Sequence, residues 1–212
     1  MRPALQRFVN AAWRAALARG RPTPEENRRR LAERGESPDA LRIREATVAD
    51  LRALAELHVT TWNATYGPMG AQGPSVEVRE RQWRERFAAN EAGAFCLVVE
   101  NARGELVGFA SAERSDHPVY AGRLDKIHLL RDYQRLGLGR RLVALVARRF
   151  LAAGIEAMWL FGDARNPSAA AWLALGAGKT DDDPGNGNYG WTDLRALVER
   201  CERAETASDV DR

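Results

Sequence analysis

One stretch of the chain decides its fold: residues 125–142, which read DKIHLLRDYQRLGLGRRL. Its first part alternates like a β-strand, and its last part has the apolar spacing of an amphipathic helix. Between them lies Gln134-x-x-Gly137-x-Gly139, whose glycines let backbone N–H groups turn inward without an obstructing side chain. The helix N-terminus adds about half a positive charge. The stretch predicts a pyrophosphate cradle, although the loop alone also fits an ordinary structural turn. It matches neither the dinucleotide fingerprint nor a P-loop.

Further strands and helices are predicted on both sides of this stretch, as expected for an α/β (α+β) domain. Helical periodicity predicts helices at Val48–Ala64, Val76–Ala89, Gly139–Ala153 and Pro167–Leu175, and a last helix that fades after Arg203. Strand patterns lie at Leu41–Glu45, Ala94–Glu100, Leu106–Glu113, Gly122–Leu130, Ala157–Phe161 and Tyr189–Leu194.

The N-terminal segment has a different composition. Residues 1–42 hold ten arginines and five acidic residues, in a chain whose formal net charge is +3. An amphipathic helix is expected over Leu5–Leu17, and a polar one over Pro24–Arg34 that begins with a Thr23 capping box. We divide the chain into an Arg-rich helical extension (1–40), a main domain (41–200) and a polar tail (201–212).

The extension has several candidate roles. Its apolar stripe must be covered, either by its own domain or by a second copy in a homodimer. A mitochondrial transit peptide also fits the first 22 residues, which contain arginines and no acid. A nucleic-acid partner is not expected, because glutamates dilute the run Arg28–Arg30.

Composition excludes several other classes. The chain has 212 residues, of which 45% are hydrophobic and 29% charged, as in an ordinary globular protein. Cys96 and Cys201 fit no disulfide framework or zinc ribbon, so we expect reduced thiols, a cytoplasmic location and no metal. No apolar run is long enough for a membrane helix.

At this point the chain resembles the GNAT superfamily of acetyl-CoA-dependent N-acetyltransferases. The resemblance covers Leu41 to Val198 and is most specific over Ile127–Leu142. Arg42–Leu54, Leu106–Ser111 and Asn166–Gly176 support it. It implies a mixed, splayed central sheet flanked by helices. Acetyl-CoA, as co-substrate, would lie between the strand before the loop and the strand Ala157–Phe161.

The resemblance also implies roles for individual residues. Ile127 and Leu129 would bind the pantetheine through their main chains, as an added strand would. The Leu129 N–H would also polarise the thioester carbonyl. Asn166 would contact the pantetheine or order its loop. The pyrophosphate would be bound by the loop, whose members are Gln134, Arg135, Leu136, Gly137, Leu138, Gly139 and Arg140.

The chain departs from the family at two positions. Arg123 stands where a glutamate is common, which leaves Asp125 as the candidate base. Asp125 shares the face of Arg123 by strand alternation, so an ion pair with an arginine is an equal alternative. The same alternation predicts that His128 faces the opposite side. Trp172 or Leu173 occupies the usual place of a tyrosine acid, and nothing in the sequence places Tyr189 as its substitute.

The implied reaction is direct attack of a primary amine, from a small molecule or a peptide, on the thioester of acetyl-CoA. Trp62 and Tyr66 lie where the family has its acceptor-site walls, although aromatic residues there also cap cores. His58 is interpreted as a satisfied core histidine, His117 as a loop residue, and Asp163 as a candidate partner for a cationic acceptor. The alternative function is a catalytically weak acyl-CoA-binding or regulatory module.

Overall fold

The computed structural model describes residues 21–162, 166, 168–180 and 188–210. The expected helix over Leu5–Leu17 and the candidate residue Asp163 lie outside these ranges. No helix in the described ranges combines the length and the apolar character needed to cross a bilayer.

The centre of the fold is a seven-stranded sheet with the order β1-β2-β3-β4-β5-β7-β6. All neighbouring strands are antiparallel except β4 and β5, which run parallel. The connection between these two strands contains a helix, as parallel neighbours require. The predicted mixed sheet is therefore confirmed. The strands are β1 Arg42–Glu45, β2 Phe95–Glu100, β3 Leu106–Arg114, β4 Gly122–Leu129, β5 Met158–Leu160, β6 Gly178–Lys179 and β7 Tyr189–Trp191.

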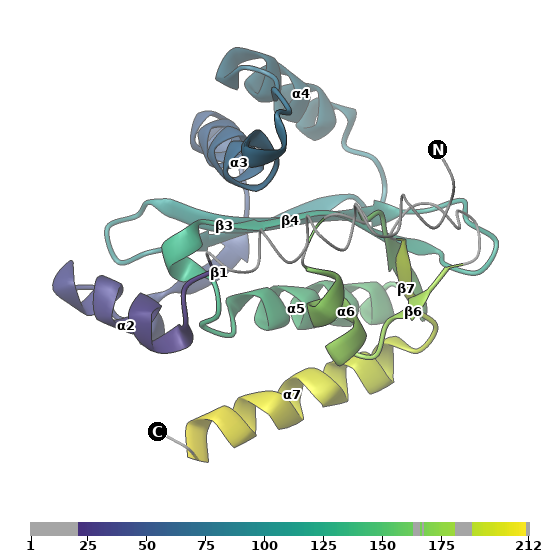
Figure 1. The fold of residues 1–212 in the computed structure, drawn as a ribbon. Helices are drawn as coiled ribbons and strands as arrows, with labels where there is room; N and C mark the ends of the chain where they lie inside the picture. The colour runs from purple at the N-terminus through teal and green to yellow at the C-terminus, as the bar shows by residue number, and fades with distance from the viewer. Residues whose placement is uncertain (1–20, 163–165, 167, 181–187, 211–212) are drawn as a thin grey trace.

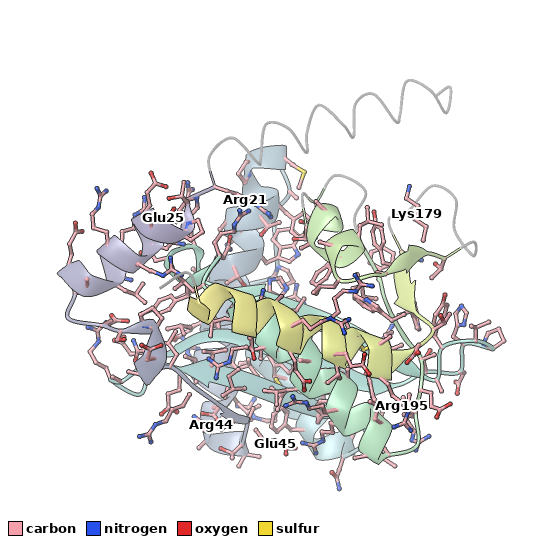
Figure 2. All side chains as sticks on the ribbon, turned by 90° about the horizontal axis from the view of Figure 1, so that it is seen from below. Arg21, Glu25, Arg44, Glu45, Lys179 and Arg195 are labelled. Atoms are coloured by element: carbon pink, nitrogen blue, oxygen red, sulfur yellow. The ribbon has the colours of Figure 1, made fainter. Side chains whose placement is uncertain are left out.

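Helices cover both faces of the sheet (Figure 1). On one face lie α3 (Leu51–Tyr66) and α4 (Val76–Ala89), which bury Phe109 of β3 together with Trp83. On the other lie α5 (Leu138–Ala152), α6 (Ala169–Ala174) and α7 (Leu194–Val210). Figure 2, seen from below, shows α7 lying across α5. The sheet is thus the middle of three layers.

The last helix is longer than the sequence pattern predicts. α7 extends to Val210, well beyond Arg203. It begins where Asp193 Oδ1 accepts hydrogen bonds from the N–H groups of Arg195 (2.9 Å) and Ala196 (3.0 Å), and β7 ends at Trp191, before the predicted Leu194. Its polar second half pairs with α5 through Arg148–Glu202 and Arg141–Glu205 (3.9 Å). The second half of α7 is held by polar contacts with α5, and a prediction based on apolar spacing cannot detect such contacts.

The helix α2 (Pro24–Glu33) packs onto the main domain. Its predicted capping box is present: the Thr23 Oγ1 accepts from the Glu26 N–H (3.1 Å), and the Thr23 N–H donates to Glu26 Oε2 (2.7 Å). Leu31 is fully buried and belongs to the core that α5 covers. α2 therefore contributes apolar surface to the same core as the sheet.

Candidate active site

Strands β4 and β5 part soon after they begin to pair. Only Gly122–Leu124 of β4 pair with β5, through Met158–Leu160. The Leu130 N–H donates to the Val107 carbonyl (2.9 Å). Because hydrogen-bonded and non-hydrogen-bonded pairs alternate in an antiparallel ladder, Ile127 and Leu129 direct their N–H and C=O groups away from β3. These groups face the side on which β5 has separated, as pairing with an extended ligand requires.

The loop after β4 leads directly into a helix N-terminus. It follows the short 3₁₀ helix η4 (Arg131–Tyr133) and ends at Gly137, the N-cap of α5. Gly137 has φ +83°, in the left-handed region that favours glycine. No side chain caps α5, so its first N–H groups have no partner within the helix. Unpaired N–H groups and the helix dipole together suit an anion.

The side chains of the loop divide between core and surface. Leu138 is buried, so it can offer a ligand only its main chain, and the partly buried Leu136 packs against the same core. Arg135 is exposed and has φ +63°. The Arg140 guanidinium lies beside Gly137, where an added Cβ would be 3.6 Å from its Nη2. Arg140 Nε is buried and has no hydrogen-bond acceptor, and it therefore suits an incoming anion.

One residue that supports this loop was missed by the sequence analysis. Asn27 of α2 is fully buried, and its Nδ2 donates to the carbonyls of Arg131 (2.9 Å) and Gln134 (2.8 Å). Gln134 Nε2 in turn donates to the Leu129 carbonyl (3.0 Å). The partners of Asn27 lie 104 and 107 residues away, so no local pattern marks it.

A small cavity of about 290 Å³ lies where β4 and β5 part. It brings together five predicted residues: Trp62, Tyr66, Asp125, Ile127 and Asn166. Its walls come from α3, α4, β4, the end of β5, α6 and β7. Lining residues that had no predicted site role include His58, Arg79, Lys126, His128, Trp172 and Tyr189.

Aromatic side chains form much of the wall of this cavity. The rings of Trp62 and Tyr66 lie 5.0 Å apart, and Asn166 Nδ2 donates to the Tyr66 hydroxyl at 3.5 Å. Trp172 faces the cavity, whereas 52% of Leu173 is exposed. Tyr189 of β7 is buried and also lines the cavity.

A β-bulge changes the faces of β4. Ser111 of β3 pairs with Lys126 and Ala112 with Leu124, so Asp125 is an extra residue without a partner. A bulge breaks the two-residue alternation. Asp125 and Lys126 consequently both contact the α4 side, which is also the side of His128. The prediction that His128 faces opposite Asp125 is wrong for this reason.

Cations surround the candidate base. Asp125 pairs with Lys126, with Arg86 Nη1 (3.4 Å) and with Arg123 Nη2 (3.5 Å). Arg86 and Arg123 are shared with Glu113. Burial raises the pKa of Asp125, but Lys126, Arg86 and Arg123 outweigh it, so this pKa is below its usual value. The ion-pair alternative is therefore present, and Asp125 is a weak proton acceptor.

The two cavity histidines are neutral. His58 is 3% exposed, lies among the rings of Trp83, Phe109 and His128, and has a pKa lowered to about 2, mainly by burial. Burial and the Lys126 charge lower the pKa of His128 to about 4. His58 Nδ1 has no hydrogen-bond partner, so His58 is a core histidine but not a satisfied one. His117 does not line this cavity. Its Nδ1 accepts hydrogen bonds from the N–H groups of Val119 (3.1 Å) and Tyr120 (3.2 Å).

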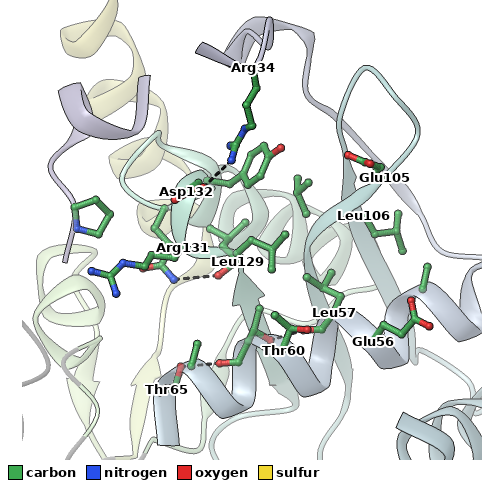
Figure 3. Close-up of a pocket in the computed structure, with 18 of the residues that line it drawn as sticks. Arg34, Glu56, Leu57, Thr60, Thr65, Glu105, Leu106, Leu129, Arg131 and Asp132 are labelled. Carbon is green, nitrogen blue, oxygen red and sulfur yellow. Dashed lines mark hydrogen bonds and ion pairs between the residues drawn. The ribbon is translucent and has the colours of Figure 1, made fainter. Parts of the chain in front are cut away.

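A larger cavity of about 980 Å³ is lined by Leu129, Leu130 and residues of α3. Figure 3 shows Leu57, Thr60 and Thr65 of α3 on one side of it, with Leu129 and Arg131 opposite. Of the predicted residues, it contains Leu129 and Gln134. Residues 135–140 line neither cavity, so the predicted cofactor residues form a path along β4 and the loop and share no single pocket.

Comparison with known proteins identifies the class to which this fold and site belong. The sequence profile of the acetyltransferase (GNAT) family matches residues 51–177. The chain therefore belongs to the GNAT family of N-acetyltransferases.

Individual relatives agree with this assignment. The chain is 29% identical over 170 residues to the uncharacterized N-acetyltransferase YuaI of Bacillus subtilis (strain 168), a match that covers 73% of the chain and 95% of YuaI. The PaiA N-acetyltransferase of Thermoplasma acidophilum, solved with coenzyme A, shares its fold (TM-score 0.54, 18% identity, 71% of this chain and 97% of that one). So does a mutant spermidine N-acetyltransferase SpeG of Vibrio cholerae (TM-score 0.54, 15% identity, 76% and 98%).

Proposed function

We propose that the protein transfers the acetyl group of acetyl-CoA to a primary amine of a small molecule or a protein N-terminus. The observation that carries the proposal is the parting of β4 from β5 after Leu124, which leaves the main chain of β4 unpaired on that side, with Ile127 lining the small cavity and Leu129 the larger one. The uncapped N-terminus of α5 and the unpaired Arg140 Nε suit the pyrophosphate of the same molecule. That PaiA was solved with coenzyme A supports this choice of co-substrate.

In this proposal the reaction is one nucleophilic displacement. The amine nitrogen attacks the thioester carbonyl carbon, the C–S bond breaks, and coenzyme A leaves as its thiolate. The Leu129 N–H donates to the carbonyl oxygen as negative charge develops on it. Only roughly one in a thousand alkyl amine molecules is unprotonated at pH 7, so a proton must be removed.

The surroundings of Asp125 restrict how that proton leaves. Because three cations hold the carboxylate and lower its pKa, we assign Asp125 no role as a base; it orients the amine by accepting a hydrogen bond from it. The proton then passes to water in the cavity. Tyr189, on the cavity wall, is the candidate that returns a proton to the departing thiolate.

The same ion pairs favour the alternative function, a catalytically weak acyl-CoA-binding module. Arg123 occupies the position of a family glutamate, and it pairs with Asp125. Intact acetyl-CoA binding, with no coenzyme A released across a broad amine panel, would support this alternative over catalysis.

Isothermal titration with acetyl-CoA tests the binding step. Gly137→Glu places a carboxylate at the N-cap of α5, and we expect it to weaken binding at least tenfold, by charge repulsion of about 1.4 kcal/mol or more. Gly154→Glu is the matched control, because Gly154 follows the other end of α5 with a similar φ of +74° and open surroundings. Equal affinity of wild type and Gly137→Glu would contradict the proposal.

A further inference from the structure

Among the described residues that line the small cavity, positive charges outnumber negative ones. Arg79 and Lys126 line it, and Asp125 is the one acid among its described lining residues. Lys126, Arg86 and Arg123 already share the charge of Asp125. The histidines of the wall are neutral, as their low pKa values require. The described part of the lining therefore presents an excess of positive charge to an entering molecule.

Arg79 of α4 is the source of that excess. Its Nη1 donates to Gln82 Oε1 (2.9 Å), but its Nε is buried without an acceptor. Within the described part of the chain, no carboxylate forms an ion pair with it. Burial without a compensating charge lowers its pKa. A buried guanidinium donor without an acceptor is costly, and a ligand anion would supply both the acceptor and the charge.

Two other arginines of α4 have acidic partners. Arg84 pairs with Glu80 (2.6 Å) and Arg86 with Glu113 (2.7 Å). Both therefore have an acidic partner from the protein itself. Arg79 differs from them in lining the cavity and in lacking such a partner.

We propose that the acceptor is a small amine that carries a carboxylate, such as a free amino acid, and that Arg79 binds this carboxylate. The inference rests on the proposed function and names its substrate class. The planar guanidinium binds a carboxylate through two parallel hydrogen bonds, which would also orient the amine. His58 Nδ1, a second unpaired polar atom in the wall, lies on the neighbouring helix α3.

The rest of the cavity limits the acceptor further. Its volume of about 290 Å³ suits a small molecule, and the rings of Trp62, Tyr66 and Trp172 offer apolar contact to a side chain. A polyamine would place further positive charge beside Arg79 and Lys126. The fold also serves the spermidine N-acetyltransferase SpeG, but a fold shared at 15% identity does not fix a substrate.

The test uses pairs of amines that differ only in the carboxylate: tyrosine with tyramine, and tryptophan with tryptamine. Spermidine is added as a polycation. Release of coenzyme A is measured with wild type, Arg79→Gln, Arg79→Lys and Arg84→Gln, the last being a control on the same helix whose side chain is 59% exposed. We expect kcat/KM of wild type to favour the acid of each pair about tenfold to a hundredfold. That ratio should fall to near one in Arg79→Gln, be partly kept in Arg79→Lys and be unchanged in Arg84→Gln.

A binding measurement keeps the inference testable if turnover is weak. With coenzyme A present, N-acetyltyrosine and N-acetyltyramine are titrated into wild type and Arg79→Gln. Wild type should bind the acid more tightly, and Arg79→Gln should not discriminate. Equal binding of both compounds by wild type, a preference for spermidine, or an equal effect of Arg79→Gln on both members of a pair would overturn the inference. Failure of wild type to bind acetyl-CoA would instead refute the proposed function.

Discussion

Replacement of Asn27 tests whether α2 supports the loop before α5. Asn27→Ala removes two hydrogen bonds, to the carbonyls of Arg131 (2.9 Å) and Gln134 (2.8 Å). Arg131 keeps a partner, since its carbonyl also accepts from the Gln134 N–H (3.2 Å). With about 1 kcal/mol for each lost bond and the cost of a carbonyl left without a partner, we expect a loss of about 2–4 kcal/mol. For a chain of this size, the melting temperature should fall by roughly 5–15 °C.

Urea denaturation measures this loss, and Arg28→Ala is its control. Arg28 is the next residue of the same helix and is exposed, so its replacement should change stability by less than about 0.5 kcal/mol. Asn27→Ala should also weaken acetyl-CoA binding, because the Gln134 carbonyl belongs to the loop. A loss below about 1 kcal/mol would refute the assignment of two structural hydrogen bonds to Asn27.

Two further substitutions probe the sheet and its first helix. Arg44 holds the pKa of Asp50 at about 2, so Asp50 stabilises the fold above the unfolded pKa near 4 and loses this contribution as pH falls toward 2. In urea denaturation, Asp50→Asn should therefore cost about 2 kcal/mol at pH 7 and progressively less toward pH 2; a pH-independent loss would contradict this. Gly108→Ala places a Cβ 2.3 Å from Leu129 Cδ2 and should cost about 1–3 kcal/mol, whereas Gly178→Ala, with nothing within 4 Å, should be nearly neutral.

Signals local in sequence predicted much of the fold. The α4 helix spans Val76–Ala89 as its periodicity predicts, and the α2 capping box forms as its residues predict. The loop between β4 and α5 was predicted from the spacing of its glycines. Such features depend on residues within a few positions of each other, so they can be read from a single sequence.

Features that depend on distant contacts could not be predicted in this way. The bulge at Asp125 depends on the register between β3 and β4. Strict alternation along β4 alone predicts that His128 and Asp125 lie on opposite faces of the sheet, whereas the bulge puts them on the same face. The support from Asn27 joins residues far apart in the chain. Arg79 belongs to no sequence motif. Only the packing of α4 beside the small cavity shows that Arg79 lines it without an acidic partner among the described residues.

Because of the bulge, Asp125 has no partner residue in the ladder between β3 and β4. Without it, Arg123, Leu124, Lys126 and Ile127 would follow the regular alternation of a strand, each still opposite its present partner. A chain lacking Asp125 should therefore fold in the same register, with the side chains of those four residues on their present faces. Insertion or deletion of the single residue Asp125 can therefore add the carboxylate to this site or remove it, while the pairing of β3 with β4 is kept.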